Sequence, residues 1–422
     1  MVQMNNIYFF IDHEPAKFKE ASIPNVFFEK GLCQKTEQSY VRFNVTGIIH
    51  ANQNFFVVLP KGYRIPDNIN TKVTLAKKIY NVLFKYKSTK ILEKDESYWL
   101  GDTQTTTTFD VSKKLIDDFR QNGLITLQKR TFENNGRGNI NWPKTFKTKT
   151  PYIKKSELVY LDFVTTKNNI VSNETISLIH SFILWNISDT YGWLFNFKYK
   201  DYSKTFTHSF MRYNLLRALN ETYMDRDIRI IKFLLSYIDN RLNEENNNYN
   251  IFVTKYFDRV WETICAKVMG NMPMLQKMVP KPYWIYLEDK KETSQIPDIL
   301  VQMNKDELII YDAKYYTLNQ NKHNLPGWGD IVKQLFYRLS LKHQYKKIYN
   351  IFLFPGTVKH AFNFSAYASV SDFEATFGNV LGYLLDIDYA IEIYLNNNEK
   401  QHQLNYKILK DAKEKYNKQD KL

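Results

Sequence analysis

Two short apolar segments that carry charged residues constrain the fold of this chain more than any other feature. The first, 296–301, contains Asp298, and the second, 308–316, contains Asp312 and Lys314. The polar stretch between them predicts a turn, so the two segments are expected to form a β-hairpin. Because side chains alternate along a strand, Asp312 and Lys314 lie on one face, and Asp298 on the paired strand can point toward it.

Charged side chains in apolar strands are costly to bury unless they are paired or bind a metal. Two converging carboxylates suit a hard divalent cation such as Mg²⁺, with waters completing its octahedron. Such a cation can activate a water molecule and neutralise the charge that develops on a phosphate. Lys314 can orient the attacking water and stabilise the same charge. The alternative is an ordinary hairpin with solvated charges at its ends.

Helical patterns flank the predicted hairpin. Segment 256–269 precedes it and carries Glu262, segment 330–341 follows it, and the apolar strand 347–354 comes next. This order of helix, two strands, helix and strand is typical of an α/β domain. We therefore expect the C-terminal half to form a central mixed sheet flanked by helices.

The Pro-Asp followed by Asp-x-Lys resembles the PD-(D/E)xK nuclease superfamily, which has a restriction-endonuclease-like fold. The resemblance implies that Asp298 and Asp312 bind Mg²⁺. It implies that Lys314 positions the water that attacks a phosphodiester. Glu262 matches a helical carboxylate that reaches the metal in many members of the superfamily.

The helix after the hairpin adds to this resemblance. Superfamily members related to RecB often place a Gln and a Tyr four residues apart on this helix, beside the site. Gln334 matches the Gln and is expected to support catalysis, but Tyr337 lies only three residues later and Arg338 stands four residues later. Lys333 is a candidate phosphate contact, with a solvated helix residue as the alternative.

Several stretches also resemble the LlaJI-type restriction endonucleases and their McrC-like relatives. They are 257–262 (FDRVWE), 297–298 (PD), 311–315 (YDAKY), 329–334 (GDIVKQ) and, upstream, 136–142 (GRGNINW). The resemblance is strongest over 255–355 and patchy over 40–160. It implies a bacterial restriction subunit that cuts double-stranded DNA with Mg²⁺. Such systems use a separate McrB-like GTPase and companion DNA methyltransferases, and this chain has no phosphate-binding loop of the G-x-x-x-x-G-K-[ST] type.

Three alternatives remain open at this point. A modification-dependent McrC-like nuclease would use the same catalytic residues but cut only methylated DNA. A transposase-like or junction-resolving nuclease would share the core. A non-catalytic DNA-binding assembly subunit would carry a degenerate nuclease fold, and the intact Asp298, Asp312 and Lys314 argue against it.

The net charge of +14 makes nucleic acid the first candidate partner, although a Lys- and Asn-rich chain can also reflect an AT-rich genome. The densest basic stretch is 129–155, which holds a single acid. Within it, residues 134–138 (NNGRG) read as a flexible, basic loop that contains Gly. We predict that Arg137, Lys144 and Lys147 contact DNA, with a solvated surface or a partner contact as the alternatives.

Four regions are expected along the chain. They are a β-rich region that binds DNA or a partner (1–160), a helical middle region (161–250), the nuclease domain (251–396) and a basic, solvated helical tail (397–422). The polar stretch 239–250 is the best candidate linker. His180 lies on an apolar helical stripe, which is typical of a core histidine.

Two cysteines are too few for a disulfide framework or a cysteine metal site. No apolar run approaches the roughly 18 residues that cross a bilayer. The N-terminal apolar run is too short for a signal peptide. We therefore expect a cytoplasmic protein with no membrane partner.

Overall fold

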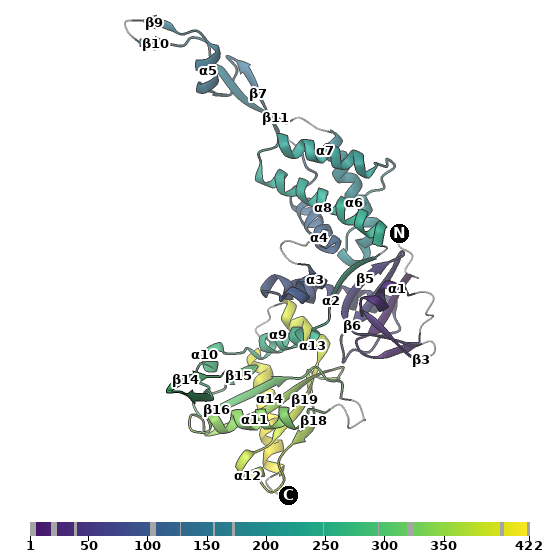
Figure 1. Ribbon diagram of the computed structural model, residues 1–422, viewed down its shortest axis with the longest axis vertical. Helices are drawn as coiled ribbons and strands as arrows, with labels where there is room; N and C mark the ends of the chain where they lie inside the picture. The colour runs from purple at the N-terminus through teal and green to yellow at the C-terminus, as the bar shows by residue number, and fades with distance from the viewer. Residues whose placement is uncertain are drawn as a thin grey trace. The chain divides into compact units, whose positions relative to one another are not determined.

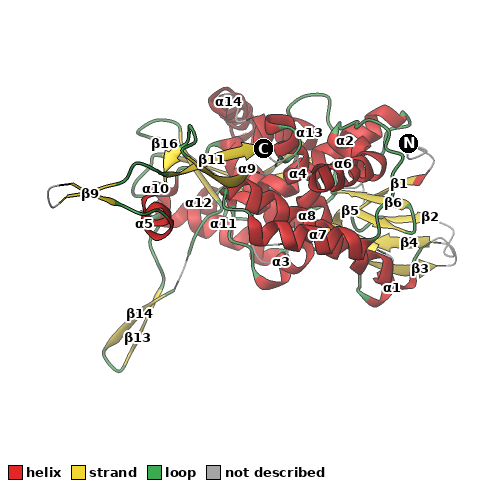
Figure 2. Ribbon diagram, turned by 90° about the horizontal axis from the view of Figure 1, so that it is seen from above, coloured by secondary structure: helices red, strands yellow, loops and turns green. Residues whose placement is uncertain are grey.

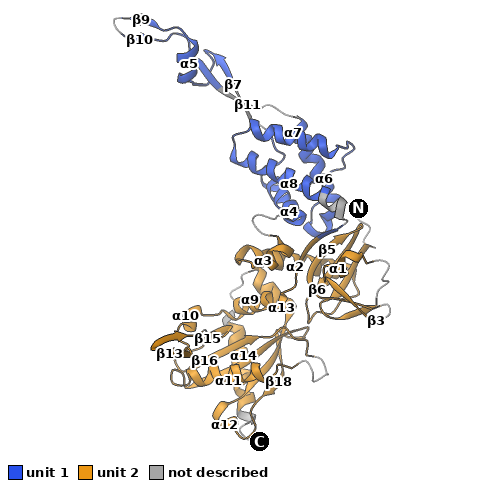
Figure 3. Cartoon of the chain, in the orientation of Figure 1, with its two compact units in different colours: residues 1–4, 106–250 blue, residues 5–105, 251–422 orange. Residues whose placement is uncertain are grey.

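A computed structural model describes residues 6–17, 23–37, 40–101, 107–126, 128–154, 157–170, 174–247, 249–293, 295–318, 325–396 and 401–419 (Figure 1). The chain forms two compact units (Figure 3). Unit 1 contains residues 1–4 and 106–250, and unit 2 contains residues 5–105 and 251–422. These units divide the chain differently from the four expected regions, since the N-terminal hundred residues join the C-terminal half.

The central sheet of unit 2 has five strands in the order β15-β16-β17-β19-β18. The strands are β15 (Ile299–Gln302), β16 (Glu307–Ala313), β17 (Lys347–Gly356), β18 (Phe362–Ala368) and β19 (Val380–Asp386). The β16, β17 and β19 strands are parallel, and antiparallel β15 and β18 close the two edges. The predicted hairpin and mixed sheet are therefore confirmed.

Helices cover the two faces of this sheet. They are α9 (Phe257–Met269), α10 (Pro273–Gln276), α11 (Trp328–Leu341), α12 (Glu374–Phe377), α13 (Ile387–Asn396) and α14 (Gln401–Gln419). Buried side chains of α11 and of the hairpin form one cluster that includes Leu300, Leu308, Ile310, Tyr337 and Leu341. The even positions of β16 therefore face α11, because side chains alternate along a strand.

The opposite face of the sheet packs on α9 and α14. The indole N–H of Trp261 donates to the carbonyl of Leu353 at 3.3 Å. The hydroxyl of Tyr311 donates to Oδ1 of Asn405 at 2.9 Å. Covering on both faces explains why β16 is a nearly continuous apolar run instead of an alternating one.

The N-terminal part of unit 2 is β-rich, as predicted. Its strands are β1 (Ile7–Ile11), β2 (Pro15–Lys17), β3 (Cys33–Glu37), β4 (Tyr40–Phe43), β5 (Thr46–Ala51) and β6 (Asn54–Leu59), and β12 (Tyr249–Thr254) pairs with β5. Its helices are α1 (Asn25–Glu29), α2 (Ile69–Thr89) and α3 (Lys94–Leu100).

Lys78 on α2 pairs with Asp388 on α13 at 2.7 Å. The hydroxyl of Tyr315 donates to Asp12 at 3.1 Å. These buried and half-buried contacts between distant parts of the sequence hold the two halves of unit 2 together.

Unit 1 is built from helices and a small β-region. The helices are α4 (Thr108–Asn122), α5 (Trp142–Thr148), α6 (Glu174–Phe195), α7 (His208–Glu221) and α8 (Asp225–Asn247). The strands are β7 (Gln128–Asn134), β8 (Asn139–Ile140), β9 (Tyr152–Lys154), β10 (Glu157–Val159) and β11 (Val164–Ile170). Ile179, Ile183, Leu215 and Leu234 belong to one buried core of α6, α7 and α8. The expected helical region 161–250 also contains a strand, β11. His180 is buried there as predicted, and burial lowers its pKa to about 4.

Two sequence predictions about polar segments are wrong. The expected linker 239–250 is instead the end of α8 and the start of β12, because Leu242 packs against the helical core and extends the helix. The expected solvated tail is the packed helix α14, with Leu404, Ile408, Leu409 and Ala412 buried. Because the segment contains many lysines, its sequence reads as polar although apolar residues lie along one side of the helix.

None of the helices that the structure describes is long and apolar enough to span a membrane.

Candidate active site

Asp298 and Asp312 lie opposite each other at one end of the β15–β16 hairpin. Ile299 pairs with Tyr311 in the antiparallel register, and continuing that register by one residue places Asp298 opposite Asp312. Directly opposite residues of an antiparallel pair point to the same face. The Oδ2 atom of Asp298 accepts a hydrogen bond from the backbone N–H of Ala313 at 3.1 Å. This bond holds the Asp298 carboxylate against the end of β16.

Two lysines accompany these carboxylates. The Nζ of Lys314 lies 2.8 Å from Oδ2 of Asp312 and 2.8 Å from Oδ1 of Asp330, which is in the first turn of α11. Burial alone would lower the pKa of Lys314, but these carboxylates raise it above its ordinary value. Lys314 is therefore a fixed cation and not a general base. Lys333 is half-exposed, and its Nζ lies 4.0 Å from Oδ1 of Asp312.

The carboxyl groups of the site have perturbed pKa values. Burial, together with the negative charge of Asp298, raises the pKa of Asp312 to about 6, against the opposing effect of Lys314. The side chain of Glu262 on α9 is exposed as a whole. Partial removal of its carboxyl from water, and then the charges of Asp298, Asp258 and Asp312, raise its pKa to about 7. Glu262 therefore lies within electrostatic range of the aspartate pair.

Asp298, Asp312 and Glu262 do not form a set of three metal ligands in this structure. Within the part of the chain that the structure describes, no three His, Cys, Asp or Glu side chains are grouped closely enough to hold a metal ion. The fold brings together Asp298 and Asp312, and Glu262 stands near them without a direct contact. The donor chemistry nevertheless fits a hard divalent cation, because such ions prefer carboxylate oxygens. Burial first, and then repulsion between the neighbouring carboxylates, raises the pKa of Asp312 and of Glu262, and a bound cation would offset both effects.

Gln334 and Tyr337 lie on α11 and bond to the backbone beside the site. Gln334 is buried, and its Nε2 donates a long hydrogen bond of 3.4 Å to the carbonyl of Ile310 on β16. The hydroxyl of Tyr337 donates to the carbonyl of Ile296 at 3.1 Å. The two side chains thus attach α11 to β16 and to the segment that leads into β15.

Asp330 is the site residue that the sequence analysis did not assign. Its Oδ1 lies 2.8 Å from Nζ of Lys314, the same distance as Oδ2 of Asp312. Its spacing of three and four residues from Lys333 and Gln334 places it on the same helical face, which is the signal that could have identified it. Only the tertiary structure brings this face of α11 to Lys314.

The predicted DNA-binding residues belong to the ordered β-region of unit 1. Arg137, Lys144 and Lys147 are exposed, and they lie on α5 and in the turn between β7 and β8. The Nζ of Lys144 lies 3.4 Å from the centre of the Phe132 ring. The predicted loop lies at 135–138, between β7 and β8, and the flanking strands, α5 and the cation–π contact give the rest of the basic segment regular structure.

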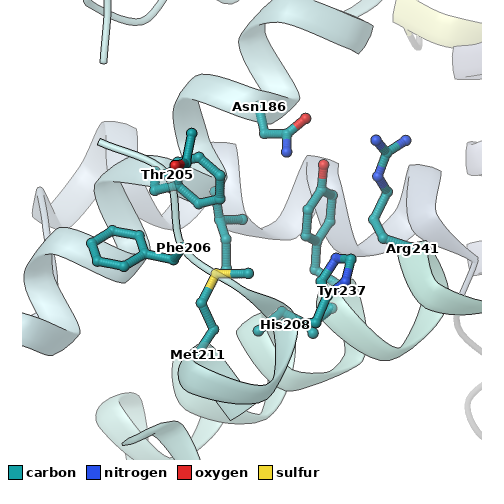
Figure 4. Close-up of a pocket in the computed structure, with 10 residues that line it drawn as sticks. Asn186, Thr205, Phe206, His208, Met211, Tyr237 and Arg241 are labelled. Carbon is teal, nitrogen blue, oxygen red and sulfur yellow. The ribbon is translucent and has the colours of Figure 1, made fainter. Parts of the chain in front are cut away.

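Unit 1 also contains a cavity of about 270 Å³ between its helices (Figure 4). Asn186, Tyr237 and Arg241 gather on one side of it, and Phe206 and Met211 on the other. Its lining includes no acidic side chain. It therefore cannot supply carboxylate ligands, and the candidate active site remains the hairpin end in unit 2.

Comparisons with known proteins point to restriction systems. The model of the LlaJI restriction endonuclease family matches residues 45–397. The type II restriction enzyme BsuMI component YdjA of Bacillus subtilis (strain 168) is 28% identical over 392 residues, which cover 87% of this chain and 81% of that protein.

Two solved structures from Thermococcus gammatolerans are also similar. One is a refined half-complex from a tetradecameric assembly of McrB AAA+ hexamers with bound McrC, with 12% identity and a TM-score of 0.41 over 92% of this chain and 98% of that chain. The other is the cryo-EM structure of the McrBC complex, with 11% identity and a TM-score of 0.20 over 55% of this chain and 70% of that chain.

Proposed function

This chain belongs to the LlaJI restriction endonuclease family, and we propose that it is the subunit that hydrolyses phosphodiester bonds of double-stranded DNA by a PD-(D/E)xK mechanism. The observation that carries the proposal is the meeting of Asp298, Asp312 and Lys314 at one end of the hairpin. The order of helix, hairpin, helix and parallel strand supports the corresponding nuclease fold.

Asp298 and Asp312 are the residues that would hold Mg²⁺, with Glu262 as the third donor. When bound, the cation supplies Lewis acidity that activates water and neutralises charge on the phosphate. Lys314 presents a fixed positive charge that orients the attacking water. Asp330 retains the ammonium of Lys314 when Asp312 serves as a metal ligand, since one cation contacts both carboxylates. Lys333 contacts the DNA backbone, and Gln334 keeps α11 on β16.

We further propose that the nuclease works with a separate McrB-like GTPase subunit. The name of the Bacillus subtilis relative describes it as one component of an enzyme. The sequence of this chain also lacks a recognisable nucleotide-binding loop of the P-loop type. A motor activity would then come from a second chain.

Cleavage of plasmid DNA tests the proposed function. Wild type and Asp312→Asn are incubated with Mg²⁺ and either unmethylated or methylated plasmid, with and without a GTPase encoded beside this chain. Discrete fragments from wild type alone are expected with unmethylated plasmid. Fragments only from methylated plasmid would establish a modification-dependent nuclease instead. Equal cleavage by both proteins, or none in any arm, would contradict the proposed chemistry.

Mg²⁺ should raise the melting temperature more at pH 8 than at pH 6. Asp312 and Glu262 have pKa values of about 6 and about 7, so they lose protons as the pH rises through this range and become metal ligands. Without metal, the raised pKa values mean that the ionised carboxyls destabilise the folded state as the pH rises toward about 7. Thermal unfolding of wild type and Asp312→Asn measures both effects. An equal Mg²⁺ response in the two proteins would exclude Asp312 as a ligand.

Replacing Arg137, Lys144 and Lys147 by alanine should weaken DNA binding and reduce its salt dependence. Each lost phosphate contact reduces the slope of log K against log salt by about 0.9. Fluorescence anisotropy at several salt concentrations measures this slope. The control variant removes three exposed lysines of unit 2, Lys94, Lys305 and Lys359. The same slope in both variants would assign the basic region of unit 1 to a partner contact or to plain surface.

A further inference from the structure

A buried carboxylate outside the candidate site contacts the residue that follows Lys314. The carboxylate belongs to Asp12, which is 4% exposed. The hydroxyl of Tyr315 donates to its Oδ2 atom at 3.1 Å. Burying a carboxylate costs free energy even when it is hydrogen-bonded, and an apolar residue of similar volume would often serve packing equally well. This cost indicates that Asp12 has a function beyond packing.

The N-terminal sheet presents Asp12 and the backbone of Lys61 at the carboxyl ends of two neighbouring strands. The β1 and β6 strands lie side by side in this sheet (Figure 2), and they are parallel, with Ile11 opposite Leu59. Asp12 comes directly after β1, and its backbone N–H donates to the carbonyl of Leu59 at 2.8 Å. Lys61 follows β6, and its backbone N–H donates to the hydroxyl of Tyr315 at 2.8 Å. The ends of two parallel strands thus bond to one side chain.

His13 fixes the orientation of the Asp12 carboxylate. Its Nδ1 atom lies 2.7 Å from Oδ1 of Asp12, whereas Oδ2 accepts from Tyr315. The backbone of His13 has a φ angle of 61°, a left-handed conformation that few residues other than glycine adopt and that costs free energy. The backbone N–H of His13 donates to the carbonyl of Phe43 at 2.8 Å. A buried charge and a strained backbone thus coincide at one contact with the catalytic strand.

Tyr315 is held by groups from two other parts of unit 2. The Nζ of Lys61 lies 4.7 Å from the centre of its ring, and the ring of Phe257, the first residue of α9, lies 5.4 Å away between centres. Burial, and then the charge of Asp12, raises the pKa of Tyr315 far above its ordinary value. The hydroxyl therefore stays protonated and donates to Asp12.

The position of the Lys314 ammonium depends on the backbone at 314–315. A lysine side chain has a long, flexible stem, so its ion pairs with Asp312 and Asp330 hold the ammonium without fixing where the stem begins. The backbone N–H of Lys314 donates to the carbonyl of Leu353 on β17 at 2.9 Å. Tyr315 anchors the next residue to the N-terminal sheet. The chain is thus held on both sides of the point where the Lys314 side chain starts.

We propose that Asp12 is a positioning residue for Lys314, and that it acts through Tyr315. This inference rests on the proposed function, because Lys314 is the cation that orients the attacking water there. A displacement of about 1 Å at a catalytic group can slow a reaction roughly a hundredfold. The N-terminal sheet, expected from the sequence to bind DNA or a partner, would then also take part in catalysis.

Single-turnover cleavage by the full chain, under the conditions in which wild type cuts plasmid, tests the proposal. Tyr315→Phe and Asp12→Leu should each slow cleavage of bound DNA about tenfold and change DNA affinity less than about twofold. The double variant should be no slower than either single variant, since both changes break the same contact. Asp12→Asn keeps an oxygen that can accept from Tyr315, so it should cut nearly as fast as wild type.

Tyr383→Phe is the matched control. Tyr383 is buried on β19, two strands away from β16, and its hydroxyl donates to Oδ2 of Asp411 on α14 at 2.8 Å. The two Tyr→Phe variants therefore each remove one hydroxyl–carboxylate bond from the same sheet. They should lower the melting temperature by similar amounts, but Tyr383→Phe should cut DNA as fast as wild type.

Acetylation of Lys314 by acetic anhydride, measured by mass spectrometry without Mg²⁺ or DNA, reports its environment independently of cleavage. The two carboxylates raise the pKa of Lys314, so little of the reactive neutral amine is present in wild type. If Tyr315→Phe and Asp12→Leu displace the ammonium from these carboxylates, Lys314 should be acetylated a few-fold faster in both variants. The rate in Tyr383→Phe should equal that of wild type.

The outcomes separate this inference from the proposed function. Unchanged cleavage by Tyr315→Phe, or an equal loss in Tyr383→Phe, would overturn the positioning of Lys314. Slower cleavage with unchanged acetylation of Lys314 would also overturn it, because the contact would then act on another part of the site. Faster acetylation in the two variants of a chain whose wild type cuts no plasmid would support the positioning and refute the proposed function.

Discussion

Replacing Lys314 by methionine should slow DNA cleavage about a thousandfold and change DNA affinity less than about twofold. The ammonium of Lys314 lies between Asp312 and Asp330, and both carboxylates keep it charged. Methionine keeps the approximate length of the side chain but removes the charge from the place where phosphate charge develops. Single-turnover cleavage and fluorescence anisotropy measure the rate and the affinity separately.

Lys333 provides the comparison for this experiment. Its Nζ is 4.0 Å from Asp312 and its side chain is 48% exposed, so solvent screens its charge more than that of Lys314. Lys333→Met should weaken binding a few-fold at most, in the range of about 1 kcal/mol, and leave the cleavage rate of bound DNA unchanged. Equal losses of rate in the two variants would contradict a special role for Lys314. The melting temperature shows whether either protein is misfolded.

Replacing Ile408 by alanine should lower the free energy of unfolding of unit 2 by about 2–5 kcal/mol. Ile408 is fully buried on α14, in the segment that the sequence predicted to be a solvated tail. The same helix carries Asn405, which accepts a hydrogen bond from Tyr311 and donates one to the carbonyl of Met269 at 2.8 Å. The cavity left by the substitution would loosen the packing of α14 on α9 and on the catalytic sheet.

Tyr406→Ala is the control, because this side chain is 69% exposed on the opposite side of α14. Surface substitutions usually change stability by less than about 0.5 kcal/mol. Urea unfolding followed by circular dichroism compares the two variants with wild type. Similar losses in both would mean that α14 does not form part of the core.

The predicted hairpin and its flanking helices were readable because their signals are local. Apolar runs bounded by polar turns specify strands, and apolar residues at helical spacing specify helices such as α9 and α11. The pairing of Asp298 with Asp312 follows from the same logic, since a short turn leaves few registers for the two strands. Glu262, Gln334 and Lys333 lie on helices that pack beside this hairpin, and their chemical roles remain proposals.

The errors concern segments whose structure depends on distant contacts. The lysine-rich sequence of α14 and the Asn-rich end of α8 are typical of solvated segments. In the structure, however, Leu404 and Ile408 are buried and Leu242 packs against the helical core. The loop at 135–138 was readable, but the strands on either side of it were not, because they are short and their sheet partner β11 comes about thirty residues later. A prediction from a short segment depends mainly on its amino-acid composition, whereas the structure of the segment depends on which side chains become buried.

The sequence by itself determined the charged hairpin, its helical neighbours and the resemblance to LlaJI-type endonucleases, because each depends on residues that are close along the chain. Only the tertiary structure shows that Asp330 contacts Lys314 and that α14 is part of the core. It alone also shows that the N-terminal strands and the separate C-terminal sheet belong to one unit. The physical reason is that these features arise from contacts between segments far apart in the chain. Burial of apolar surface between these segments and ion pairs between them stabilise such contacts, and a local pattern of residues cannot predict either.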